Sequence, residues 1–234
     1  MLLLLMAIGT LLPWTVSHAQ TTDPFVTAMG YYTDSEGEQQ ESNSIDDGEA
    51  PLTVSFRANP EDMGIWTPSF EWHFRKVGVD GDLFVRYEEN TEYTFTESGT
   101  YNVVLKTFLH SDEFESELDS QTVTVVIAES KLVFPNAFSP NGDGKNDIYR
   151  AKEYKSIVSF RAIILNRWGQ KLYEWNDPAE GWDGKHNGHD VKQGVYFALV
   201  EAKGADGKDY KIRKDVNLLR GFTSKEGNST TTNE

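Results

Sequence analysis

Residues 137–147, AFSPNGDGKND, hold the densest set of potential cation ligands in this chain. Asn141, Asp143 and Gly144 follow the order of the third, fifth and sixth positions of an EF-hand calcium loop. The twelfth position would then be Arg150, where such a loop needs a bidentate Glu. Asn146 and Asp147 offer further oxygens, which leaves Ca²⁺ in a different cage as an alternative. The composition favours a structural turn over a metal site.

A second candidate metal site is the stretch DGKHNGHD, residues 183–190. His186 and His189 have side chains that bind transition metals, and Asp183 and Asp190 flank them. The Asn-Gly pair between the two histidines is typical of a tight β-hairpin, because both residues tolerate positive φ. We therefore expect a hairpin here and no bound metal.

Catalytic motifs are missing from the sequence. There is no HExxH, GxSxG, Walker A or GxGxxG pattern, and the absence of cysteine excludes a thiol nucleophile, a disulfide framework and a Cys-type zinc site. Carboxylates are so numerous that no pair stands out as a general acid and base. We expect a protein that is not an enzyme.

The charge of the chain changes sharply near its middle. Residues 20–129 hold 23 acidic and 5 basic residues, whereas residues 130–234 hold 14 acidic and 17 basic residues. The acidic part would repel phosphate groups, which makes nucleic acid a poor partner. The contrast predicts two separately folded units.

The first 19 residues have the pattern of a secretory signal peptide. An apolar run from Leu2 to Leu12 is followed by Pro13 and by Ser17-His18-Ala19, whose small residues at −3 and −1 predict cleavage after Ala19. A membrane anchor is the alternative, but eleven apolar residues are too few to cross about 30 Å of hydrocarbon. We expect export across the inner membrane and no transmembrane segment in the mature chain.

Strand periodicity dominates the first unit. Residues 51–58 alternate apolar and polar side chains, residues 69–74 place Phe70, Trp72 and Phe74 on one side, and further alternating runs occupy residues 91–109 and 121–128. Residues 34–50 are acidic and contain Gly, and we expect a long exposed loop there. Short strands at this spacing predict a β-sandwich.

The second unit has its own hairpin signals. Residues 157–175 form two strands around a five-residue loop, Asn166 to Gln170, that contains Gly169. Residues 194–202 and 209–219 form two more strands that turn at Ala205-Asp206-Gly207. The polar tail 221–234 is expected to be disordered. The pattern again predicts a small β-sandwich.

Residues 24–128 resemble a PKD-type domain, an immunoglobulin-like β-sandwich. The resemblance rests on GEAPLTVSFRA, FEWHF, FTESGTYNVVLKTF and TVTVVIA. After EWHF the chain has Arg75-Lys76-Val77-Gly78 where the family favours a Gly-Asp-Gly turn. The resemblance implies a spacer, or a module that contacts a surface protein or glycan.

Residues 132–220 closely resemble the gliding-motility-associated C-terminal domain, the type B sorting signal of the type IX secretion system. The motifs FPNAFSPNGDGKND, ILNRWGQKLYE, WDGKHNG and GVYFALVEA occur in the family's order. The resemblance implies a folded immunoglobulin-like module, recognition by type IX machinery that includes a PorP-family outer-membrane protein, and delivery to the cell surface or the medium. The family usually ends at its last strand, whereas this chain continues for another 14 residues.

The sorting motif can be carried over residue by residue. Its expected members are Phe138, Pro140, Asn141, Gly142, Asp143, Gly144, Asn146, Asp147, Asn166, Arg167, Trp168, Gly169, Trp182, Asp183 and Gly184. In the first loop Pro140 fixes φ, the glycines permit left-handed backbone, and Asn141 and Asp143 can accept bonds from downstream amides. We expect a rigid loop that joins the two domains and that a receptor can bind at low entropic cost.

These features predict an all-β chain with two immunoglobulin-like β-sandwich domains in tandem after a signal peptide. The segments are 1–19 (signal peptide), 20–129 (PKD-like), 130–220 (sorting domain) and 221–234 (tail). The expected function is non-enzymatic type IX cargo. Two alternatives are a structural component of the envelope or gliding apparatus and a glycan-binding adhesin.

The adhesin alternative depends on exposed tryptophans. Sugars would stack on Trp66 and Trp72, or on Trp168, Trp175 and Trp182. Aromatic residues in register on strands are usually core, and we expect these to be buried.

Overall fold

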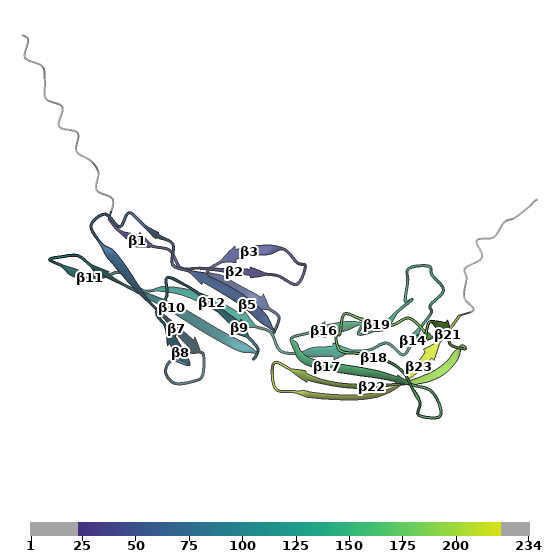
Figure 1. Cartoon of the computed structure of the whole chain (residues 1–234). Coiled ribbons are helices and arrows are strands. Elements are labelled where there is room, and N and C mark those ends of the chain that lie inside the picture. Colours follow the sequence, from purple (N-terminus) through teal and green to yellow (C-terminus); the bar gives the residue numbers. More distant parts are fainter. Residues whose placement is uncertain (1–22, 221–234) are drawn as a thin grey trace, which may run out of the picture.

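The computed structural model describes residues 23–220, and these residues form β-strands and turns without a helix. The predicted all-β class is confirmed, with two strand-rich regions at about 25–127 and 131–218 that lie end to end (Figure 1). The predicted signal peptide and polar tail lie outside the described residues. Within 23–220 the chain has no helix able to cross a lipid bilayer.

The first region contains two sheets. One has the order β4-β12-β10-β7-β8, with β11 paired to β10, and the other has the order β3-β2-β5-β9; β1 and β6 form a separate pair. The strands are β1 (Phe25–Val26), β2 (Met29–Thr33), β3 (Gln39–Ser42), β4 (Ser44–Gly48), β5 (Leu52–Arg57), β6 (Pro60–Glu61), β7 (Thr67–Lys76), β8 (Phe84–Arg86), β9 (Asn90–Phe95), β10 (Gly99–His110), β11 (Glu115–Glu117) and β12 (Gln121–Ile127).

Aromatic side chains from both sheets form the core of the first region. The ring of Phe56, on β5, lies 5.8 Å from that of Trp72 and 5.4 Å from that of Phe74, both on β7. These three side chains are at most 1% exposed. The alternation predicted for residues 51–58 and 69–74 is confirmed, because its apolar members face this core.

The expected exposed loop at 34–50 is wrong. Residues 39–42 form β3 in a hairpin with β2, and residues 44–48 form β4, which pairs in parallel with β12. Ile45 is 2% exposed because β4 directs it into the core. A parallel partner that lies about 80 residues away leaves no local pattern, and one apolar residue among acidic neighbours does not suggest a strand.

The second region is one full sheet covered by short strand pairs. The sheet has the order β14-β23-β22-β17-β18, and the pairs are β13-β16, β15-β19 and β20-β21. The strands are β13 (Lys131–Val133), β14 (Ala137–Phe138), β15 (Tyr149–Arg150), β16 (Glu153–Lys155), β17 (Ile157–Leu165), β18 (Lys171–Trp175), β19 (Gly181–Trp182), β20 (Lys185–His186), β21 (His189–Asp190), β22 (Gly194–Gly204) and β23 (Asp209–Leu218). The predicted hairpins at 157–175 and 194–219 are present within one or two residues.

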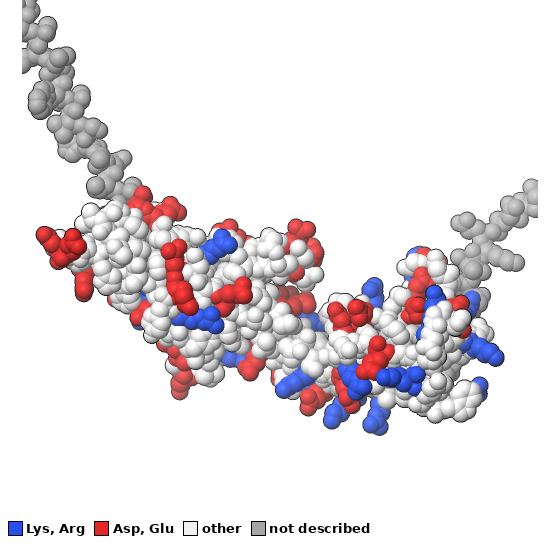
Figure 2. Space-filling model, in the orientation of Figure 1, with Lys and Arg blue, Asp and Glu red and all other residues white. Residues whose placement is uncertain are grey.

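Contacts between the regions involve the turn between β22 and β23. The carbonyl of Ala205 accepts a hydrogen bond from the Ser98 amide at 3.0 Å, and Ala205 packs into the core of the first region. The Ser156 hydroxyl accepts a bond from the Ala50 amide at 3.2 Å. Figure 2 shows acidic side chains over the first region and most of the basic ones over the second, as the sequence indicates.

The loop that contains residues 139–148 does not join the two domains. It connects β14 to β15 inside the second region and lies at the end remote from the first region (Figure 1). The junction instead falls at residues 128–130, between β12 and β13. The prediction of an interdomain elbow is therefore wrong. It placed the loop too close to the boundary because β13 and β14 are only three and two residues long.

Candidate functional site

Asp147 organises the predicted sorting loop. Its Oδ1 atom accepts the backbone N–H groups of Asn141 and Gly142, both at 2.8 Å, and its Oδ2 atom accepts that of Gly144, also at 2.8 Å. These hydrogen bonds, above all the one from Gly142, hold the pKa of the Asp147 carboxyl below its ordinary value. The Asp147 carboxylate thus lies at the centre of three backbone amides of its own loop.

The local bonds predicted for Asn141 and Asp143 are present. Asn141 Oδ1 accepts the amide of Asp143 at 3.1 Å, and Asp143 Oδ1 accepts the amide of Lys145 at 2.8 Å. Gly142 and Gly144 have φ values of 79° and 81°, which suit glycine. The Ser139 amide donates to the Asn146 carbonyl at 2.8 Å and closes the loop. The loop has a defined shape, as expected.

The carboxylates of this loop are engaged by its own backbone. Among residues 23–220 there is no group of three or more His, Cys, Asp or Glu side chains placed to hold a metal ion. The carboxylates of Asp143 and Asp147 both accept backbone amides within the loop. The arrangement supports the structural turn that the composition favours.

The second motif packs against the first. The ring of Trp182 lies 5.3 Å from that of Phe138, and its indole N–H donates to the Lys185 carbonyl at 2.7 Å. Gly184 has a φ of 78°, and a Cβ atom there would lie 3.0 Å from Pro140 Cγ. Residues 138–140 and 182–184, more than 40 positions apart in sequence, therefore share one site.

Arg220 binds both motifs, and sequence reasoning did not identify it. Its guanidinium donates to the carbonyls of Gly184 at 2.7 Å, Val191 at 3.1 Å and Pro140 at 3.5 Å. Arg220 was assigned only as the last residue of the domain. Its role depends on β23 returning beside the loop, which no local pattern encodes.

The third motif forms the tip of the β17-β18 hairpin. Asn166 Oδ1 accepts the amides of Trp168 at 3.0 Å and Gln170 at 3.1 Å, and Asn166 Nδ2 donates to Gln170 Oε1. Gly169 has a φ of 79° and donates to the Asn166 carbonyl. The predicted five-residue loop is confirmed. The Asn166 side chain and the Gly169 backbone build this turn, whereas the side chains of Arg167 and Trp168 make none of its hydrogen bonds.

Trp168 is 76% exposed, and its predicted burial is wrong. The Arg167 guanidinium carbon lies 4.5 Å from the centre of the Trp168 ring, a cation–π arrangement. Trp168 is at the tip of a turn, where strand alternation no longer directs side chains inward. Trp72, Trp175 and Trp182 are buried as predicted, and Trp66 is half-buried. Sugar stacking on buried Trp72 is thereby excluded.

The histidine pair lies on a hairpin, as predicted. Asn187 and Gly188 have φ values of 51° and 79°, and β20 pairs with β21 across them. His186 Nδ1 lies 2.8 Å from the Leu172 carbonyl, to which the ring N–H donates. His186 thereby anchors the hairpin to β18.

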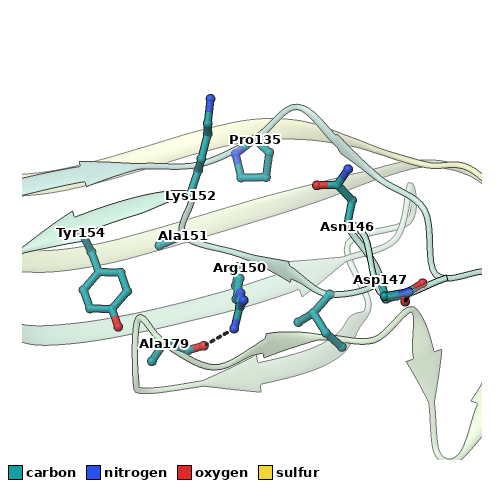
Figure 3. A pocket seen from close by; sticks show the side chains of 10 residues that line it. Pro135, Asn146, Asp147, Arg150, Ala151, Lys152, Tyr154 and Ala179 are labelled. Carbon is teal, nitrogen blue, oxygen red and sulfur yellow. Dashed lines mark hydrogen bonds between the residues drawn. The ribbon is translucent and has the colours of Figure 1, made fainter. Parts of the chain in front are cut away.

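An open groove of about 510 Å³ lies beside the sorting loop (Figure 3). Asn146 and Asp147 line one end and Tyr154 the other, while Arg150 points between them and donates to the Ala179 carbonyl at 3.4 Å. Arg150 and Lys152 are exposed. The groove is thus lined by two basic side chains, one carboxylate and an aromatic ring.

The first region contains one cluster of charged side chains around a buried histidine. His73 Nδ1 lies 2.7 Å from Asp82 and Nε2 lies 3.1 Å from Glu71. Arg75 also pairs with Asp82, and the Arg75 and His73 bonds lower the pKa of the Asp82 carboxyl. The cluster ties β7 to the turn before β8.

Comparisons with known proteins place the second region. The family model described as the CHU_C type IX secretion signal domain matches residues 132–214. No curated protein matches the chain. A solved structure of Bacteroides ovatus mixed-linkage glucan utilization locus SGBP-B, in complex with a mixed-linkage heptasaccharide, is 15% identical with a TM-score of 0.25.

That match covers 85% of this chain and 48% of the solved one. At this TM-score the likeness carries no argument about fold or function. The family match covers β14 to β22, the three motifs and most of β23. A type IX secretion signal implies export to the cell surface or outside the cell. Residues 132–214 are a CHU_C type IX secretion signal domain, and the protein is type IX secretion cargo.

Proposed function

We propose that the far end of the second region is the surface that the type IX machinery reads, and that the protein is a non-enzymatic surface or secreted protein. The observation that supports this most strongly is the meeting of two distant motifs. Phe138 and Pro140 pack on Trp182 and Gly184, and Arg220 bonds to both segments. A surface assembled from three chain segments exists only in the folded domain, which suits a signal that is read after folding.

Some motif residues hold the fold of the domain and others are exposed, and this difference supports the same proposal. Asp147, Asn166 and Gly184 have their polar or backbone groups engaged within the domain. Trp168 is exposed on a turn whose shape is held by hydrogen bonds. Such an arrangement offers a rigid contact, which costs little conformational entropy when a partner binds. A PorP-family outer-membrane protein is the proposed partner, by resemblance.

The first region is proposed to be a PKD-type spacer or contact module. Its two sheets packed through Phe56, Trp72 and Phe74 suit an immunoglobulin-like sandwich, and its acidic surface suits an exposed position in solvent. It has no catalytic motif in its sequence. The fold alone does not choose between spacer and contact module.

Secretion assays test this function. In a cell with an active type IX system, the full chain is expected on the surface or in the medium, and a chain cut after residue 129 is expected to remain in the periplasm. A reporter with a signal peptide and residues 130–234 at its C-terminus should also leave. Equal release of the full and the cut chain would refute the proposal.

A further inference from the structure

The outer face of the five-stranded sheet changes character along its length. On β22, Tyr196, Ala198 and Val200 point into the core, with exposed fractions of 9%, 0% and 1%. Because side chains alternate along a strand, Val195, Phe197 and Leu199 lie on the opposite face. Val195 is 50% exposed and Phe197 is 38% exposed. The strand thus presents large apolar groups to solvent.

The neighbouring strand extends this apolar surface. The register pairs Leu165 of β17 with Phe197 and Ile163 with Leu199. Leu165 and Ile163 are half-buried, and they alternate with the fully buried Ile164. We call this set the apolar face; it consists of Ile163, Leu165, Val195, Phe197 and Leu199.

The same face is charged at its other end. Toward the first region, the next outward residues are Arg161 on β17 and Glu201 on β22, which lie opposite each other in the strand register. Both are exposed. Contiguous apolar residues at one end of a face that is charged at its other end are typical of an interaction surface.

The apolar face adjoins the exposed hairpin tip. Leu165 immediately precedes Asn166, the first residue of the turn that carries Arg167 and Trp168. The core cluster of the region, with its covering strands β13, β15, β16 and β19, lies on the inner face of the sheet. No strand among residues 23–220 therefore covers the apolar face.

Polar residues border the apolar face on both sides. On β23, Asp215 pairs with Phe197 and Arg213 with Leu199; on β18, Lys171 pairs with Leu165 and Glu174 with Ile163. An apolar centre with a polar rim is the usual anatomy of a protein–protein interface.

A cation at the hairpin tip, beside the polar rim, indicates what the partner offers. Glu174 is already paired with Arg161 and Lys171. Arg167 forms no ion pair within residues 23–220 and stacks on Trp168 instead. A guanidinium held in place by an aromatic ring is ready to bind a carboxylate. A second copy of this chain would bring a further Arg167 to the same interface.

We infer that the apolar face and the Arg167–Trp168 tip form one docking surface for a protein of the type IX machinery, which presents an apolar patch and a carboxylate. This inference rests on the proposed function and deepens it, because it places recognition on a sheet face as well as on the motif loops. All five apolar residues and the tip lie within the secretion signal domain. A secretion signal acts by being bound by its transport machinery, which is why the occupant is that protein.

The test uses the full chain in secreting cells. Phe197→Asp and Trp168→Ala are expected to lower the exported fraction and to weaken capture of the outer-membrane partner by at least tenfold, because central aromatic anchors dominate interfaces. The matched controls are Val79→Asp and Tyr87→Ala in the first region, where the exposed fractions are 51% and 70%. These controls should be exported normally.

A photo-crosslinking amino acid at position 197 or 168 separates docking from misfolding. We expect an adduct with a type IX outer-membrane protein from these positions and none from position 87. Normal export of both Phe197→Asp and Trp168→Ala, or an adduct only with a second copy of the chain, would overturn the inference. Since the chain cut after residue 129 tests the proposed function separately, the docking surface can fail while that function stands.

Discussion

The Oδ1 atom of Asp147 lies 2.8 Å from the backbone nitrogen of Gly142, five residues earlier in the chain. Two further amides, from Asn141 and Gly144, point at the same carboxylate. One side chain thereby fixes the course of the whole loop between β14 and β15. The carboxylate, rather than the glycines alone, gives this turn its shape.

Replacing Asp147 with Ala should loosen the loop. The three amides lose their acceptor, so hydrogen exchange at Gly142 and Gly144 should become about tenfold faster or more. Exchange monitored by NMR measures this directly, and export of the full chain should fall as well. Asp143→Ala is the control, because the Asp143 carboxylate accepts the Lys145 amide and none of these three. Equal exchange in both variants would contradict the role of Asp147.

The same carboxylate predicts an acid-sensitive loop. Its pKa is lowered in the fold from an ordinary value of 3.8. A group of this kind stabilises the folded loop above its unfolded pKa, and the contribution is lost as the pH falls through the lower, folded pKa. The amide shifts of Gly142 and Gly144 should therefore titrate with a midpoint below pH 3.8. In Asp147→Asn that titration should vanish; its persistence would assign it to another group.

Gly184 and Gly188 form a matched pair for measuring the contact between the motifs. Both have positive φ, 78° and 79°, but a Cβ atom at Gly184 would lie 3.0 Å from Pro140 and Arg220 atoms, whereas nothing lies within 4 Å at Gly188. Gly188→Ala should lower the free energy of unfolding by about 1 kcal/mol through backbone strain. Gly184→Ala should lower it by about 2–4 kcal/mol, because overpacking adds to that strain. Urea unfolding gives both values. Equal losses of unfolding free energy would show that the two motifs are not closely packed at Gly184.

Tyr149 carries a buried hydroxyl in the core of the second region. Its side chain is fully buried, and its oxygen has no hydrogen-bond partner among residues 23–220. Burial raises the pKa of the Tyr149 phenol well above its usual range. Tyr149→Phe should raise the free energy of unfolding by about 1 kcal/mol, because an unpaired buried hydroxyl is removed. Tyr154→Phe, at a 43% exposed position, should change little. A destabilised Tyr149→Phe protein would reveal a hydrogen bond to this hydroxyl.

Local patterns were sufficient for much of the fold. The alternation in residues 51–58 and the turn chemistry at Asn166–Gln170 and Asn187-Gly188 predicted strands and hairpins that the structure contains. The two turns join strands that are neighbours in sequence, so the signal and the structure concern the same few residues. The alternation in β5 marks its buried face, although its partners β2 and β9 lie farther away in the chain.

The features that were missed depend on distant pairing. β4 forms only because β12 lies beside it, and Arg220 reaches Pro140 only because β23 ends there. The site residues were predicted as separate motifs, but their union at one end of the domain follows from the topology of the sheet. The exposure of Trp168 was missed because a turn, unlike a strand, has no simple alternation of inward and outward side chains.

Ala205 of the signal domain packs against the first region, and this contact has a practical consequence. Ser98 and Ala50 belong to the first region. The Ser98 amide donates to the Ala205 carbonyl of the signal domain, and the Ala50 amide donates to the Ser156 hydroxyl of that domain. When a foreign protein replaces the first region, the Ala205 carbonyl and the Ser156 hydroxyl face the surface of that protein instead. The melting temperature of a transplanted signal domain then depends on the protein fused to it as well as on the domain itself. Two fusions that carry the same signal domain need not be equally stable to heat.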